Sequence, residues 1–201
     1  RSKDANDRTH LGVLKMLNMS GEGHFIENMQ ELNFLPVSIS YEYDPCDFLK
    51  AREFLLKRDN PDFKKNAEDD LLSMGTGLKG YKGRVHFQVC KPLNDELSGL
   101  AELGDRNQQV AGLAQIIDKY IHLNYKFYPG NYIAFDILKN QSVFGDRYTE
   151  KDKEKFLAYI EHQLNKIPEK DNNYDFLFNS LVEMYSNPVI NHYEALGKPI
   201  I

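Results

Sequence analysis

The order of apolar and polar residues predicts a chain that alternates helices and strands and then becomes helical. Apolar residues recur every three or four positions, as on one face of a helix, in residues 10–19, 24–33, 47–58 and 66–74. Two short segments instead alternate apolar and polar residues, which is typical of strands: FLPVSISYEY, which contains Pro36, and VHFQV, from Val85 to Val89. Pro36 stands at the entry of the first strand, where its missing N–H group is tolerated.

After the second strand, every predicted element is a helix. Helical spacing continues in residues 93–103, 105–125, 150–167 and 173–184, with Thr149 as an N-cap and Pro168 as a stop. Two strands are too few for a stable sheet. We therefore expect further strands in polypeptide upstream of Arg1.

Composition and charge narrow the function classes. The 201 residues carry a formal net charge of −5, which disfavours a dedicated nucleic-acid-binding protein. The two cysteines, Cys46 and Cys90, are typical of free thiols in a reducing compartment rather than of a disulfide framework. The longest apolar runs are far shorter than the roughly 20 residues that a membrane-spanning helix needs. We therefore expect any membrane contact to be peripheral.

Standard catalytic and metal-binding motifs are missing from the sequence. The histidines and cysteines show no metal-ligand spacing, and His86, His122 and His162 are expected on the surface. The segment GTGLKG, at residues 75–80, lacks the G-K-[ST] ending of a phosphate loop and precedes a strand instead of a helix. We therefore predict neither a metal nor a redox cofactor.

The opening RSKD groups side chains that suit a phosphate. Arg1 and Lys3 flank the hydroxyl of Ser2. An arginine can form two hydrogen bonds to a phosphate, and serine and lysine add a further donor and a charge. The same residues would also fit a solvated chain terminus. The residues alone leave both interpretations open.

Taken in order, three segments make the chain resemble the glycerolphosphate and lysophosphatidate acyltransferase family. Arg1-Ser2 resembles the end of that family's Glu-Gly-(Thr)-Arg-Ser block, and Leu35-Pro36-Val37-Ser38-Ile39 resembles its apolar-Pro-Val-x-Ile strand. Residues 85–93 resemble a later strand that ends in Gly-Lys-Pro-Ile, with cysteine in place of glycine. RSKDANDRT and TGLKGYKGRVHF are most similar to an acyltransferase group of Bacteroides-type bacteria. The resemblance covers residues 1–93 through motifs and the remainder only in general terms.

The resemblance implies a bacterial enzyme of phospholipid synthesis. Such an enzyme moves a fatty acyl group from a thioester, acyl-CoA or acyl-carrier protein, to a hydroxyl of glycerol phosphate or lysophosphatidate. Arg1 would be the main contact to the acceptor's phosphate, with Ser2 and Lys3 in support, and Pro36 would shape the wall beside it. The family's His-x-x-x-x-Asp pair, a general base and the residue that orients it, is missing from the sequence. We therefore expect these 201 residues to be inactive by themselves.

The fold class that follows is α/β. Residues 1–93 would be the C-terminal part of the acyltransferase α/β domain, with few strands, and residues 94–201 a helical region packed on it. The resemblance also implies a cytoplasmic protein, with peripheral contact at the inner face of the cytoplasmic membrane. The aromatic-rich residues 120–135 fit core packing better than an acyl-chain groove.

Two other interpretations stay open. The chain would also fit a non-catalytic helical module that docks on a protein or lipid partner. Lys79, Lys82 and Arg84 would then contact anionic lipid, although solvated lysines in an exposed loop are the simpler interpretation. In the remaining alternative, the motif matches arise by chance.

Overall fold

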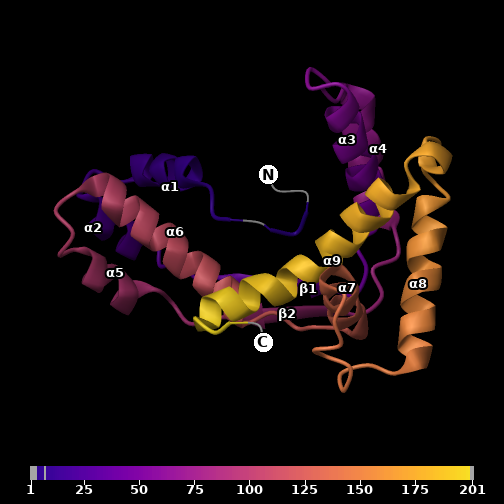
Figure 1. Cartoon of the computed structure of the whole chain (residues 1–201). Helices are drawn as coiled ribbons and strands as arrows, with labels where there is room; N and C mark the ends of the chain where they lie inside the picture. Colours follow the sequence, from indigo (N-terminus) through magenta and orange to yellow (C-terminus); the bar gives the residue numbers. More distant parts are fainter. Residues whose placement is uncertain (1–3, 7, 200–201) are drawn as a thin grey trace.

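The chain is mostly helical and carries one small sheet (Figure 1). The computed structural model describes residues 4–6 and 8–199. Its α-helices are α1 (Leu11–Leu17), α2 (Phe25–Glu31), α3 (Asp47–Asp59), α4 (Ala67–Lys79), α5 (Asn94–Leu100), α6 (Arg106–Leu123), α7 (Pro129–Lys139), α8 (Glu150–Leu164) and α9 (Tyr174–Leu196). Two 3-10 helices, η1 (Asn18–Ser20) and η2 (Lys170–Asn172), and two strands, β1 (Val37–Tyr41) and β2 (Val85–Val89), complete the described elements.

The two strands pair antiparallel, with Ile39 opposite Phe87. The predicted alternation is present, but the face that it buries is the polar one. Ser38 and Ser40 are buried, and the Ser40 hydroxyl accepts a hydrogen bond of 2.9 Å from the backbone N–H of Lys126. The apolar side chains on the other face are all at least 40% exposed: Val37, Ile39, Tyr41, Val85, Phe87 and Val89. The sheet therefore turns its apolar face to solvent.

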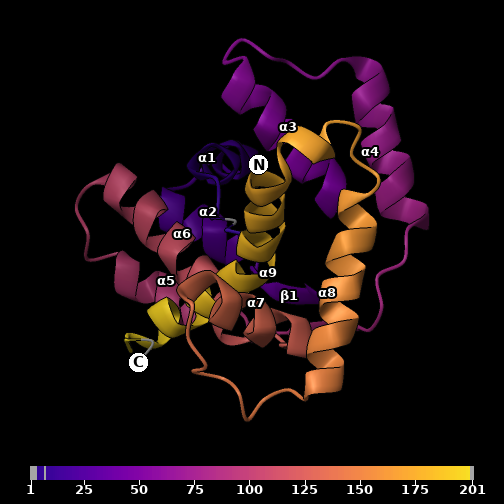
Figure 2. The same ribbon diagram turned by 45° about the vertical axis from the view of Figure 1, so that its right-hand side comes forward.

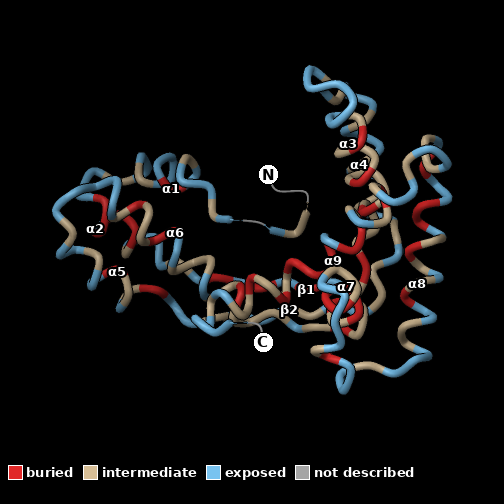
Figure 3. The backbone as a smooth tube through the Cα atoms, in the orientation of Figure 1, coloured by how far each residue is buried: buried red, intermediate tan, exposed pale blue. Residues whose placement is uncertain are grey.

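Two groups of helices bury the main core (Figure 1). Helices α1, α2, α5 and α6 enclose one cluster, formed by Leu14, Phe25, Ile26, Met29, Leu93, Leu97, Val110, Leu113 and Ala114. Helices α3, α7, α8 and α9 enclose a second cluster, which includes Ala51, Leu55, Ile133, Phe156, Ile160, Leu164, Leu177 and Leu181. Figure 3 marks the buried residues in these helices. Both clusters join residues from either side of position 93, the expected boundary between the α/β region and the helical region.

Helix α9 belongs to the second group, where it contacts α3, α7 and α8, and it also contacts α6 of the first group (Figure 2). The sequence predicts that this helix ends at Met184, and that prediction is wrong, because α9 continues through Pro188 to Leu196. A proline inside a helix costs roughly 3 kcal/mol. Burial of Val182 and Val189, both fully buried, offsets this cost.

Helix α4 also extends beyond its predicted end. Asn66 caps it as expected: its side chain accepts a hydrogen bond of 2.8 Å from the backbone N–H of Asp69. The helix then continues past Met74, through two glycines, to Lys79. Across the part of the chain that the structure describes, no helix is both long and apolar enough to cross a membrane.

Candidate functional site

The N-terminal segment, residues 4–6 and 8–10, lacks regular secondary structure but is held against α6 and α9. The Asn187 side-chain amide donates a hydrogen bond of 2.7 Å to the carbonyl of Asp4. The backbone N–H and the hydroxyl of Thr9 both donate to Oδ1 of Asp118, at 2.8 and 2.7 Å. The segment is thus tied to α9 at one end and to α6 at the other.

Two asparagines explain why α9 holds this segment. Asn187 and Asn191 lie one helical turn apart, so their side chains share a face. Both are more than nine-tenths buried, and a buried amide without hydrogen-bond partners costs free energy. Asn191 donates to the carbonyl of Ala5 at 3.4 Å. Ala5 has a left-handed backbone, φ 58°, which costs on the order of 1 kcal/mol and persists because the segment is fixed.

Arg8 connects the segment to both helices. Its Nη2 donates to Asn191 at 3.0 Å and to Glu194 at 2.9 Å, and its Nη1 lies 3.3 Å from Nδ1 of His122. A guanidinium can only donate, so Nδ1 of His122 accepts and the proton of the neutral ring is on Nε2. The Arg8 and Glu194 side chains are about half exposed, so their ion pair contributes little by itself.

The predicted phosphate contacts Arg1, Ser2 and Lys3 lie outside the described residues. Asp4, the next residue in the chain, is the first described residue. Pro36 is buried at the entry of β1, and its carbonyl accepts a hydrogen bond of 2.9 Å from Cys90. Helix α6 contacts both the N-terminal segment, through Asp118, and the strand β1 that follows Pro36.

Sequence reasoning missed the residues that hold the segment. His122, expected on the surface, is 2% exposed, and its ring contacts the Arg8 side chain. Asp118 and the two α9 asparagines were not identified as site residues either. One signal could have found the asparagines: two amides four positions apart, which share one face of a helix.

Asp47 forms a second polar cluster, inside the core. The hydroxyls of Tyr159 and Tyr185 each donate to Asp47 Oδ2 at 2.7 Å, and the Gln163 amide donates to Oδ1. Burial raises the pKa of Asp47 to about 6, although the hydrogen bonds from the two tyrosines oppose the shift. Perturbed carboxyl groups often mark functional sites. Asp47 is 0% exposed, however, so a substrate has no access to it, and its role is to join α3, α8 and α9.

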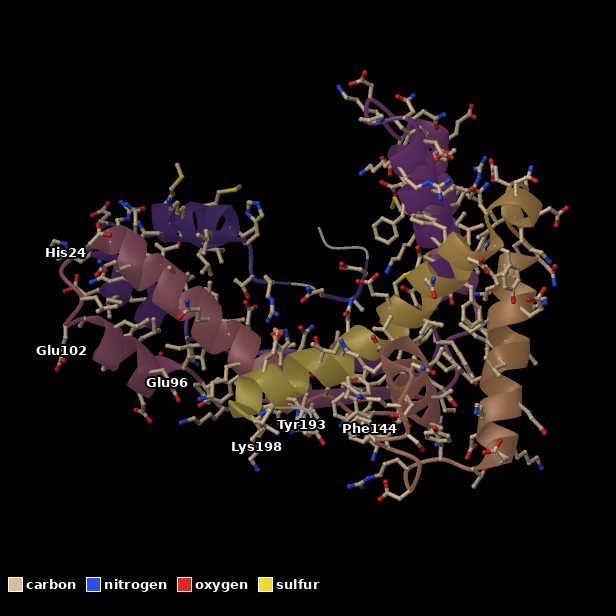
Figure 4. The ribbon with its side chains drawn as sticks, in the orientation of Figure 1. His24, Glu96, Glu102, Phe144, Tyr193 and Lys198 are labelled. Atoms are coloured by element: carbon tan, nitrogen blue, oxygen red, sulfur yellow. The ribbon has the colours of Figure 1, made fainter. Side chains whose placement is uncertain are left out.

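The remaining candidates are weaker. An open hollow of about 570 Å³ lies between α2, α5 and α6, with His24 and Arg106 in its lining. Figure 4 places His24 at the end of the molecule far from α8.

Burial raises the pKa of the Cys46 and Cys90 thiols, which makes them poor nucleophiles at neutral pH. Within residues 4–6 and 8–199, no group of three or more histidine, cysteine, aspartate or glutamate side chains is placed to hold a metal ion.

Comparison with known proteins gives no relative: no protein-family model, curated protein or solved structure matches this chain. The function has to be argued from the residues and their geometry.

Proposed function

We propose that this chain is the C-terminal part of an acyltransferase of phospholipid synthesis. The enzyme moves a fatty acyl group from acyl-CoA or acyl-carrier protein to a hydroxyl of glycerol phosphate or lysophosphatidate. The observation that carries this proposal is the anchoring of the N-terminal segment on α6 and α9. A loop that recognises an anion must be held in its binding geometry by surrounding residues, whereas a solvated tail needs no such support.

The chemistry assigns a role to each predicted residue. Arg1 forms two hydrogen bonds to the phosphate of the acceptor, and Ser2 and Lys3 add a donor and a charge. Pro36 shapes the wall beside them. The acceptor hydroxyl attacks the thioester carbonyl and loses its proton to a histidine general base, the C–S bond breaks, and the thiol leaves with a proton. That histidine and its aspartate belong to polypeptide outside these 201 residues, and the reaction needs neither a metal nor a redox cofactor.

The sheet supports the same proposal. A two-stranded sheet is marginal by itself, and β1 and β2 expose a continuous apolar face. Such a face is expected where an α/β domain continues in further layers outside the residues at hand. The proposal includes a cytoplasmic location with peripheral contact at the inner face of the cytoplasmic membrane.

The test is binding of glycerol 3-phosphate to the 15N-labelled chain, followed by NMR. We expect the amide signals of Asp4 and Ala5 to shift in a saturable way. In Arg1→Ala, we expect the same signals not to shift. The exposed Lys198 provides a matched control, and Lys198→Ala should bind like the wild type. Absence of saturable shifts, or shifts that persist in Arg1→Ala, would refute the proposed phosphate site. Acyl transfer by the chain alone would refute the placement of the catalytic pair outside it.

The second candidate function is a non-catalytic binding module. The observation in its favour is the amount of exposed apolar surface on α4 and on the sheet. Under this candidate, glycerol 3-phosphate does not bind at the N-terminal segment, so the same NMR titration separates the two functions.

A further inference from the structure

Helix α4 turns its apolar side to solvent. Leu71, Met74 and Leu78 are 68%, 71% and 81% exposed. Their spacing of three and four residues places them in one stripe along the helix. The structure describes every residue of α4 and none of them is buried.

The opposite side of α4 faces the rest of the chain. The Ser73 hydroxyl accepts a hydrogen bond of 3.1 Å from Lys65, and its carbonyl lies 3.3 Å from Sγ of Cys46. A Cβ on Gly77 would lie 3.5 Å from the same sulfur. A surface helix normally packs its apolar side on the core. Because α4 packs its small and polar side instead, no element among the described residues covers the apolar stripe.

The charges beside the stripe define what can cover it. Successive residues of a helix are rotated by about 100°, which places Glu68 and Lys79 on the same edge of the stripe. They are 11 positions apart, so one lies near each end, about 16 Å from the other along the helix axis. The stripe thus has an acidic end and a basic end.

This arrangement is self-complementary. Two identical helices that pair antiparallel about a two-fold axis bring the same edge of each stripe together. Glu68 of each copy then faces Lys79 of the other, and Leu71 meets Leu78. The axis passes close to Met74, midway between the paired positions, so the Met74 side chains of the two copies meet at the centre of the interface.

We propose that α4 is a self-association surface, which pairs antiparallel with α4 of a second copy of this chain. An anionic lipid surface fits less well, because Glu68 and Asp70 lie beside the stripe and would be repelled. One helix face is a small interface, so we expect a dissociation constant of the dimer in the micromolar range or weaker. The inference is independent of the proposed enzymatic function.

The first experiment is sedimentation equilibrium of the full chain between about 1 µM and about 500 µM. We expect the mass to rise from the monomer value of 23.3 kDa toward twice that value. Leu78→Glu should stay monomeric throughout. Met16, on α1, is 70% exposed, and Met16→Glu is the matched control that should dimerise like the wild type. A wild type that stays monomeric, or a Met16→Glu chain as monomeric as Leu78→Glu, would overturn the proposal.

Charge exchange tests the antiparallel arrangement. Glu68→Lys and Lys79→Glu each place like charges opposite one another, and each should weaken the dimer several-fold. The double variant restores opposite charges and should recover most of the affinity. A double variant that is no tighter than either single variant would rule out the pairing. Docking on anionic vesicles would behave differently, because Glu68→Lys would then strengthen binding and Lys79→Glu would weaken it.

Discussion

The buried carboxyl group of Asp47 makes folding stability depend on pH in an unusual direction. Burial raises its pKa from 3.8 to about 6 in the folded chain. The folded state therefore binds the proton more tightly than the unfolded state does. The contribution of Asp47 to stability is complete below about pH 4 and is lost as the pH rises through 6.

The size of the effect follows from the shift. About two pKa units correspond to roughly 3 kcal/mol in total, of which about 1 kcal/mol develops between pH 7 and pH 5. Glu42 and Glu169 have pKa values lowered by their arginine partners, so they act in the opposite direction. Their contribution is lost only at lower pH, as they become protonated. Histidines also titrate between pH 7 and pH 5, so the contribution of Asp47 is the difference between the wild type and Asp47→Asn.

Urea unfolding at pH 7, 6 and 5 measures the effect. From pH 7 to pH 5, the wild type should gain about 1 kcal/mol of stability relative to Asp47→Asn. Asp47→Asn keeps an oxygen for the tyrosine hydroxyls but has no proton to gain, so its stability should lack this increase. Asp171, which is exposed, supplies the control Asp171→Asn, which should follow the wild type. If Asp47→Asn retains the full increase, another group is responsible and the assignment fails.

Three further predictions concern packing, capping and the N-terminal segment. Leu181→Ala, at a fully buried position, should lower the free energy of unfolding by about 3 kcal/mol in urea; a loss below 1 kcal/mol would contradict the core assignment. Thr149 Oγ1 accepts from the Asp152 N–H, so Thr149→Ala should cost about 1 kcal/mol and Thr149→Ser almost nothing. Asn191→Ala should speed hydrogen exchange of residues 8–10 about tenfold, and unchanged exchange would disprove the anchoring.

Local patterns predicted most of the elements correctly. Alternation found both strands, and the capping residues Asn66 and Thr149 marked the starts of α4 and α8. The ends of helices were harder to predict, because α4 continues through two glycines and α9 through a proline. At Pro188 the packing of α9 against its neighbours outweighs the local cost. Local rules give the free-energy cost of continuing a helix through such a residue, but packing against distant residues decides whether the helix continues.

The face of the sheet that is buried could not be predicted from β1 alone. Ser40 is inside because a backbone N–H more than 80 positions away needs an acceptor there. The polar residues of the candidate site are likewise fixed by partners that are distant in the sequence. Asp118 and Asn187 lie more than 100 positions from the segment that they hold, so only the folded chain brings them together.

The position of α9 has a consequence for synthesis on the ribosome. The cluster around Leu14 and Leu113 uses residues that have all emerged once α6 is made, so it can form early. The cluster around Ile133 and Phe156 needs Leu177 and Leu181, and α9 is the last of the described helices to be translated. Until then α3, α7 and α8 have their apolar sides uncovered. A ribosome stalled within α9 would therefore hold a half-folded chain, the form that chaperones bind most readily.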